Sequence, residues 1–321
     1  MTDSCSIIIP TINYNRELEN CINGCLKLKK VKIKIYVISD TKIKKKIKNT
    51  IFLSFGKINM SKKRNIGVSL SRTKYIAFLD SDCYPTKNWI YNAIKVLKKN
   101  KKIGLITGPD FPFLNQIGFQ KTIGNAHKSF ILSGSKIFRK SLTSKKIVKQ
   151  ASSCNMILER KTYNFVKGMD PHIYIGEDVD FCNRINKFYY ILYNPNVKIF
   201  HKSREFLPFL AQRYAYGTCI FDTMKFTKTY KNLQYFVPLI ITILFILSLF
   251  SYSYNLQLSF IYINIFFMLL VFIESLRLSK SPIEIVKLNI ILILGVVFFG
   301  LGSISKILGF SKNIKSIYTY R

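Results

Sequence analysis

The amino-acid sequence predicts an α/β fold with a mostly parallel sheet, followed by a C-terminal transmembrane helical region. Up to about residue 230, short β-branched runs alternate with amphipathic stretches. After residue 233, long apolar runs carry almost no charge. We therefore expect a first domain over residues 1–230 and a membrane region over residues 231–321, which a chain of 321 residues can accommodate.

The first predicted strand and helix open the chain. The run SIIIP at 6–10 is β-branched and ends in proline, which is typical of a buried strand. Asn15 then stands where a helix N-cap is expected. The apolar residues that follow recur at the spacing of one helix face: Leu18, Cys21, Ile22, Cys25 and Leu26.

The same alternation continues along the chain. Strands are expected at 33–39, 75–80 and 103–107, with one helix at 62–72 and another from Thr86 onward. Alternating strands and helices predict parallel pairing, with helices on both faces of the sheet. In such sheets, ligands bind outside the carboxyl ends of the strands.

Acidic residues gather at those predicted strand ends, although the chain has few of them. Lys and Arg number 50 against 16 Asp and Glu, for a net charge of +34. Asp40 follows the second strand, Asp80 ends the third, and Asp82 lies two residues beyond it. An Asp-x-Asp pair at a strand end can hold a hard divalent cation that bridges phosphate oxygens. The segment DSDCYP is equally typical of a plain turn.

A second acidic cluster and a histidine lie further along the chain. Glu177, Asp178 and Asp180 fall within GEDVD, just before an amphipathic helical pattern. They either complement the dipole of that helix or provide a carboxylate pair, one member of which accepts a proton. His201 follows a strand-like run, where a single histidine is more often structural than a ligand.

The basic excess consists mostly of lysine runs such as KIKKKIKN at 42–49. Each run is typical of a solvated surface, and together the runs favour attraction to an anionic membrane face or an anionic substrate. No nucleic-acid partner is expected, because the lysines are not interleaved with aromatic residues and no zinc-finger spacing occurs. The seven scattered cysteines are interpreted as reduced and mostly packed.

Three apolar runs form the predicted membrane region, at about 234–254, 256–275 and 287–305. The first two are long enough to span, and the third either spans or lies at the interface. Positive charge on both sides of the first two places the first domain in the cytoplasm. A full third span would put Lys306 and Arg321 outside, against that rule. We expect a multi-pass membrane protein that contacts membrane lipid.

Three blocks of the sequence, in this order and spacing, resemble family 2 of the glycosyltransferases, whose fold is named GT-A. They are SIIIPTINYNRELENCI, KKRNIGVSLSRTKYIAFLDSDCYPTKNWI and SSCNMILERKTYNFVKGMDPHIYIGEDVDFCNRI. The resemblance covers about residues 5 to 217. It implies a GT-A-type nucleotide-binding domain and a divalent cofactor, Mn²⁺ or Mg²⁺.

The resemblance also implies roles for residues of the donor site. Those that would bind the nucleotide sugar are Pro10, Thr11, Asn13, Asp40, Arg64, Asn65 and Asp80. Ser39 stands where the family usually has an acid, which leaves the nucleotide's identity open. The segment QRYAYG at 212–217 is similar to a basic, aromatic helix that lies near the phosphates in the family.

The remaining implied roles concern the metal and the chemistry. Asp82 matches the metal-binding acid, and His201 matches a metal ligand of some members. Asp178 matches the catalytic base, with Glu177 as its acceptor-binding partner. Direct displacement with a single base inverts the anomeric centre.

The sequence therefore predicts a membrane-anchored inverting glycosyltransferase. It would move a sugar from a nucleotide-sugar donor to a hydroxyl of an envelope glycan or lipid-linked acceptor, as in polysaccharide biosynthesis. A processive polysaccharide synthase is an alternative, although the Q-x-x-R-W motif of such enzymes is missing. The others are a nucleotidyltransferase on a similar fold, which would not need GED at a helix start, and an inactive membrane-bound scaffold.

Overall fold

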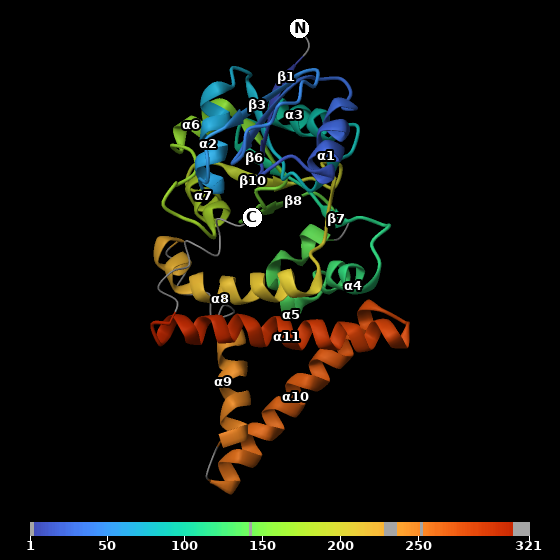
Figure 1. The fold of residues 1–321 in the computed structure, drawn as a ribbon, viewed down its shortest axis with the longest axis vertical. Coiled ribbons are helices and arrows are strands. Elements are labelled where there is room, and N and C mark those ends of the chain that lie inside the picture. Colours follow the sequence, from blue (N-terminus) through green and yellow to red (C-terminus); the bar gives the residue numbers. More distant parts are fainter. Residues whose placement is uncertain (1–2, 141–142, 228–235, 251–252, 311–321) are drawn as a thin grey trace. The chain divides into compact units, whose positions relative to one another are not determined.

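The structure is a computed structural model that describes residues 3–140, 143–227, 236–250 and 253–310 (Figure 1). The described chain forms two compact units. The first contains residues 3–111 and 138–202, and the second contains residues 112–137 and 203–310. The domain boundary expected at residue 230 stays a prediction.

The first unit is built on an eight-stranded, mostly parallel sheet, as the sequence predicts. Its strand order is β3-β2-β1-β4-β9-β6-β10-β8. β1 lies in the middle and pairs in parallel with both β2 and β4. The strands are β1 (Ser4–Pro10), β2 (Lys32–Ser39), β3 (Thr50–Ser54), β4 (Tyr75–Phe78), β6 (Ile103–Thr107), β8 (Lys146–Val148), β9 (Met156–Glu159) and β10 (Tyr190–Tyr193).

One central strand departs from the parallel pairing that alternation predicts. β9 lies between β4 and β6 and runs antiparallel to both. All four of its residues are buried, and Met156, Ile157 and Leu158 present apolar side chains to both faces of the sheet. Its position is set by long-range pairing, because β9 comes about 50 residues after β6 in the chain.

Helices cover both faces of this sheet (Figure 1). α1 (Arg16–Leu26) and α3 (Trp89–Lys99) contribute to one buried core, and α6 (Arg160–Phe165) and α7 (Glu177–Asn186) contribute to the other. α2 (Met60–Leu70) adds Val68 to the second core. Asn15 caps α1 as predicted, since its Oδ1 accepts a hydrogen bond from the Leu18 amide at 2.9 Å.

A small three-stranded sheet adjoins the acidic segment after β4. Its order is β5-β11-β7, with β5 (Cys83–Pro85), β11 (Ile199–His201) and β7 (Asp110–Pro112). β11 pairs antiparallel with β5, in a register that sets His201 opposite Cys83. This pairing brings residues more than 110 positions apart to one place.

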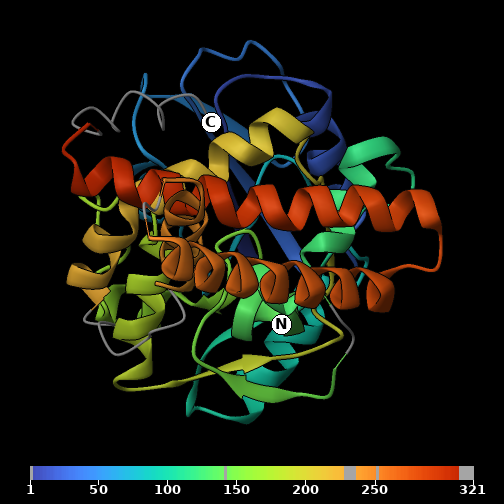
Figure 2. The same cartoon turned by 90° about the horizontal axis from the view of Figure 1, so that it is seen from below.

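The second unit is helical. It contains α4 (Gly118–Ala126), α5 (Phe130–Ser133), the start of the 3₁₀ helix η1 (Gly134–Lys140), α8 (Phe206–Thr227), α9 (Val237–Phe250), α10 (Tyr254–Leu278) and α11 (Pro282–Ile307). Within this unit α11 lies along α8, while α9 and α10 form a hairpin that projects from them (Figures 1 and 2). The apolar cores of this unit join α4, α8, α10 and α11.

Glycines allow α8 and α11 to approach closely. A Cβ atom on Gly217 would lie 1.9 Å from the Phe299 carbonyl oxygen, and one on Gly302 would lie 2.0 Å from the Tyr214 oxygen. Neither position therefore tolerates a side chain without moving the helices apart. This contact explains two glycines that interrupt otherwise apolar helical patterns.

Two helices of the described chain, α10 and α11, are long and apolar enough to cross a membrane. In its most apolar 18-residue stretch, 44% of α11 is buried within the structure, against 11% for α10. α9, in the first predicted span, has 14 helical residues. The helices thus coincide with the three predicted apolar runs, and α11 is the one that packs most against other helices.

Candidate functional site

The carboxyl ends of β1, β2 and β4 lie at one edge of the sheet, as parallel pairing requires. The loops that follow β1 and β2 are tied together: the Thr11 amide donates to the Ile38 oxygen at 2.9 Å, and the Asp40 amide donates to the Ile12 oxygen at 3.0 Å. Pro10 and Thr11 are buried here, and Asn13 is exposed. The Thr11 hydroxyl donates to the Asn13 oxygen at 3.0 Å, which gives this loop a fixed shape.

A buried ion pair holds Asp40 in this loop cluster. The Lys63 Nζ lies 2.7 Å from the Asp40 Oδ1 and donates to the Thr11 oxygen at 2.5 Å. Burial lowers the pKa of Lys63 below its usual range, although the attraction of Asp40 opposes that effect. Lys63 was not among the predicted site residues, because KKR in a lysine-rich chain is typical of a solvated helix face.

Arg64, the next residue of α2, connects the two predicted acidic clusters. Its guanidinium contacts the Asp80 Oδ1 at 2.9 Å and the Glu177 Oε1 at 3.0 Å. Burial disfavours the charged guanidinium, but the two carboxylates outweigh that effect, so the pKa of Arg64 is raised. The segments DSD and GED, far apart in sequence, therefore belong to one site.

The start of α7 places Glu177 and Asp178 side by side. Gly176 precedes them with a φ of 83°, a left-handed conformation that favours glycine. Burial and the neighbouring Asp178 raise the pKa of Glu177 to about 7, against the pull of Arg64. The Asp178 Oδ1 accepts a hydrogen bond from the Val179 amide at 2.9 Å. A carboxylate pair with one member near neutrality is suited to proton transfer.

The third acid of this cluster and Asn65 have structural contacts. Asp180 pairs with Arg184 at 2.6 Å, four residues along the helix. The Asn65 Nδ2 donates to the Met169 oxygen at 2.7 Å, and its Oδ1 accepts from the Met169 amide at 3.0 Å and from the Tyr163 hydroxyl. Asn65 thus shapes the loop that leads to α7, and its amide is occupied by those partners.

Asp80, Asp82 and His201 form a possible cation site. Their ligand atoms lie within 4.8 Å of one another, and the His201 Nε2 is 3.3 Å from the Asp82 Oδ1. Burial opposes protonation of His201, but Asp82 and the contact with Cys154 outweigh it and raise the pKa of His201 well above its usual range. Two carboxylates and one imidazole suit Mn²⁺, and the oxygen ligands also suit Mg²⁺.

A cluster of ion pairs around the buried Asp110 was not among the predicted site residues. Asp110 pairs with Arg139 at 2.7 Å and with Lys140 at 3.2 Å. Burial opposes the ionisation of Asp110, but these cations outweigh it and hold its pKa far below the usual range. The sequence did contain a signal: Asp110 follows the strand at 103–107, as Asp40 and Asp80 follow theirs.

The segment QRYAYG lies in α8, in the second unit. There the Arg213 Nε donates to the Gly295 oxygen at 2.9 Å, and its guanidinium stacks over the Phe299 ring. Arg213 is buried by these contacts within the helical unit. These contacts join α8 to α11.

Comparisons with known proteins agree with this architecture. The family model described as glycosyl transferase family 2 matches residues 6–164. Among solved structures, the chain is similar to mannosyltransferase PcManGT from Pyrobaculum calidifontis in complex with GDP-Man and Mn²⁺. The match has a TM-score of 0.60 and 11% sequence identity, and it covers 95% of this chain and 87% of that chain. At this identity the likeness shows the GT-A fold. No curated protein matched the sequence.

Proposed function

Because the chain belongs to glycosyl transferase family 2, we propose that it moves a sugar from a nucleotide-sugar donor to an acceptor hydroxyl. One observation carries the proposal: Arg64 contacts Asp80 and Glu177 together. The buried Arg64 guanidinium thereby joins the end of β4, which is suited to a metal and phosphates, to the start of α7, which is suited to a general base. Each cluster alone has a structural explanation, and their union at one sheet edge favours a catalytic site.

The loops after β1 and β2 would hold the nucleoside of the donor. Pro10, Thr11 and Asn13 would form the wall of this pocket, and Asp40, paired with Lys63, would contact the base or ribose. Ser39, at the position where the family usually has an acid, is buried and its hydroxyl donates to the Thr41 oxygen at 2.6 Å. The chain therefore offers one acid to the nucleoside, and a panel of nucleotide sugars would show which nucleobase this pocket prefers.

Asp80, Asp82 and His201 would hold the divalent cation, Mn²⁺ or Mg²⁺. The similar mannosyltransferase was solved with Mn²⁺, which supports this assignment. Such a cation, when bound, stabilises the negative charge that develops on a leaving diphosphate. Arg64 would lie beside that diphosphate, next to Asp80, and Asn65 would support it by shaping the loop before α7.

Asp178 would accept the proton of the acceptor hydroxyl as the sugar is transferred. Glu177, held by Arg64, would orient the acceptor through a hydrogen bond. One base acting in a direct displacement inverts the anomeric centre and needs no covalent intermediate on the protein. Glu177 and Asp178 then have different tasks because Arg64 restrains only the first.

The acceptor would be an envelope glycan or a lipid-linked sugar at a membrane. α10 and α11 support membrane attachment by their length and apolar composition. Lysine-rich flanks favour a multi-pass arrangement with the catalytic unit in the cytoplasm, where nucleotide sugars are made. Protease protection in inverted vesicles and in intact cells tests that orientation.

Release of nucleoside diphosphate from a panel of nucleotide sugars tests the activity. The full chain in detergent should release it from at least one donor in the presence of Mn²⁺, and Asp178→Asn should not. Release of pyrophosphate would instead indicate a nucleotidyltransferase, and long products would indicate a processive synthase. No release from any donor, with or without membrane lipids, would contradict the proposal.

A further inference from the structure

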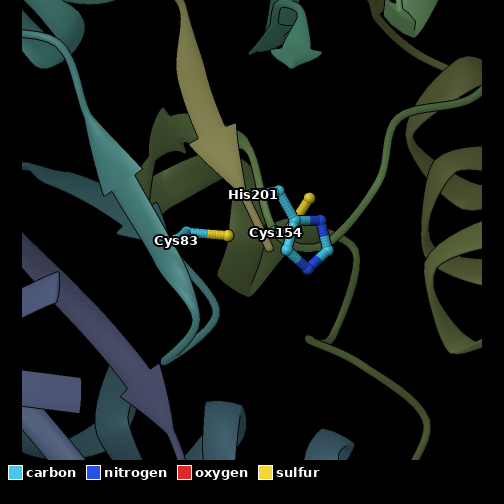
Figure 3. A group of neighbouring side chains, drawn as sticks. All are labelled: Cys83, Cys154 and His201. Carbon is cyan, nitrogen blue, oxygen red and sulfur yellow. The ribbon is translucent and has the colours of Figure 1, made fainter. Parts of the chain in front are cut away.

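A second group of possible metal ligands touches the proposed catalytic site. Cys83 in β5, Cys154 before β9 and His201 in β11 turn toward one another (Figure 3). Their two sulfur atoms and one imidazole nitrogen lie within 4.8 Å of one another. His201 thus belongs both to this group and to the Asp80 and Asp82 group.

The local fold explains why these three side chains converge. Cys83 and His201 are directly opposed in the antiparallel pairing of β5 with β11, so their side chains lie on the same face. Cys154 is held by its neighbour Asn155, whose side chain accepts from the Trp89 indole at 2.8 Å and donates to the Val197 oxygen at 2.9 Å. The three ligands are therefore fixed by backbone pairing and a buried amide.

The surroundings of Cys154 differ from those of a simply packed thiol. Its sulfur lies 3.3 Å from the Ser152 hydroxyl and 3.8 Å from the Asp110 Oδ2. Cys83 and Cys154 are almost fully buried, whereas the side chains of His201 and Asp82 are 26% and 38% exposed. An ion can therefore approach from the side of His201 and meet two sulfurs behind it.

The ligand types select a different ion from the one proposed for catalysis. Two thiolates and an imidazole favour zinc-like, thiophilic cations, whereas carboxylates favour Mg²⁺ and Mn²⁺. On binding, each thiol releases its proton to solvent, and water or Asp82 completes a tetrahedron. A neutral imidazole has one lone-pair nitrogen, so it can serve only one of the two ions at a time.

We propose that Cys83, Cys154 and His201 form a binding site for a thiophilic divalent cation such as Zn²⁺, which competes with the catalytic cation for His201. Zinc would thereby inhibit transfer, because the catalytic cation held by Asp80 and Asp82 would lose His201 as a ligand. The thiolate site stands on its own geometry. Only the inhibition rests on the proposed function.

Cobalt binding tests the site without reference to activity. The full chain in detergent, kept reduced with a phosphine, is titrated with Co²⁺ and followed for thiolate-to-cobalt charge-transfer bands and strong visible bands of tetrahedral cobalt. The wild type should show both, and Zn²⁺ should remove them. Cys83→Ser combined with Cys154→Ser should abolish the charge-transfer bands.

A second buried cysteine pair supplies a matched control. Cys21 and Cys25 lie one turn apart in α1 and belong to no three-ligand group among the described residues. Cys21→Ser combined with Cys25→Ser should keep the cobalt bands. Absence of the bands in wild type, or their survival in the Cys83 and Cys154 variant, would overturn the proposal. If that variant fails to fold, X-ray absorption of the zinc-loaded wild type decides, with two sulfurs at about 2.3 Å expected.

Displacement of Mn²⁺ tests the competition. Electron paramagnetic resonance should show bound Mn²⁺ in wild type and its release when one equivalent of Zn²⁺ is added. The Cys83 and Cys154 variant should bind Mn²⁺ and retain it. Mn²⁺ that stays bound in zinc-loaded wild type would refute the shared ligand. Cobalt–thiolate bands in a protein that binds no Mn²⁺ would count against the proposed catalytic cation and the competition, and would leave the thiolate site standing.

Discussion

Two neighbouring regions of the site are organised by consecutive residues of α2, and they differ in kind. On the nucleoside side, Lys63 neutralises one carboxylate, Asp40, and both side chains are almost fully buried. On the transfer side, Arg64 bridges Asp80 and Glu177, which remain partly exposed. An ammonium is a compact point charge, whereas a guanidinium presents a planar fork that can serve two partners.

The two regions therefore differ in exposure: the Lys63 pair is shielded from solvent, whereas the carboxylates paired with Arg64 are partly exposed. The Lys63 pair balances the charge of Asp40 inside the loop cluster and fixes the shape that this cluster would offer to the nucleoside. The Arg64 pairs involve carboxylates that are partly exposed, and one of them, Asp80, also belongs to the cation site with Asp82. We therefore expect substitutions at Lys63 to act mostly on folding, and substitutions around Arg64 to act mostly on chemistry.

Arg64→Ala should have the largest effect, because it leaves Asp80 and Glu177 without their shared partner. Sugar transfer should fall below detection, and the free energy of unfolding should fall by less than in Lys63→Met, because the Asp80 and Glu177 side chains are partly exposed. Arg64→Lys should recover stability but little activity, since an ammonium cannot bridge both carboxylates with a fork. Thermal unfolding and transfer assays check both. The exposed Lys62→Ala variant on the same helix is the control.

Lys63→Met should lower the free energy of unfolding by about 3–5 kcal/mol, because it leaves Asp40 buried without a counter-charge. The double variant with Asp40→Asn should lose less than Lys63→Met alone, since no uncompensated charge remains. Unfolding of the full chain in detergent measures both values. A Lys63→Met protein that has wild-type stability but no longer transfers sugar would contradict the distinction between the two regions.

Asp178→Asn should lower the transfer rate by roughly 10²–10⁴-fold, the usual cost of losing a positioned base. Donor binding should be unchanged, because Asp178 is separate from the Asp40 pocket. Single-turnover transfer and donor titration distinguish the two quantities. Near-normal turnover would contradict the assignment of Asp178 as the general base and would favour Glu177 instead.

Glu177→Gln should remove a pH dependence of stability. The carboxyl has a pKa of about 7, against 4.5 as its ordinary value, so between these values the folded protein holds a proton that the unfolded chain has released. The free energy of unfolding should therefore fall as pH rises from 4.5 to 7, by at most about 3 kcal/mol. The variant should show a flatter profile over that window, and an equal slope in both proteins would refute the assignment.

Much of this fold could be predicted from local pattern. The β-branched runs that became β1, β2, β4 and β6 carry a strong strand signal, and Asn15 caps α1 as its position indicated. The antiparallel β9 could not be placed, because its neighbours β4 and β6 are far from it in sequence. Alternation of elements reports connection order and says little about a strand inserted later.

The residues of the candidate site likewise divide into those that the sequence pattern indicates and those that only tertiary contacts reveal. Asp80, Asp82 and Asp178 stand out because acids are scarce in this chain, and their motifs are short and ordered. Lys63 and Arg139 have no such contrast in a chain with 50 basic residues, so only tertiary contacts reveal them. Cys83 and Cys154 were expected to be packed thiols, and they are buried. Their approach to His201 depends on the register of β5 with β11.

The most direct test is cation-dependent release of nucleoside diphosphate by the wild type and by Asp82→Ala, measured with the best donor of the panel. The account predicts that wild-type release requires Mn²⁺ or Mg²⁺ and stops in excess chelator. Asp82→Ala should release little at any cation concentration that saturates the wild type, while its fold is retained. Full release by the wild type in excess chelator, or by Asp82→Ala, would contradict the assignment of this sheet edge as the catalytic centre.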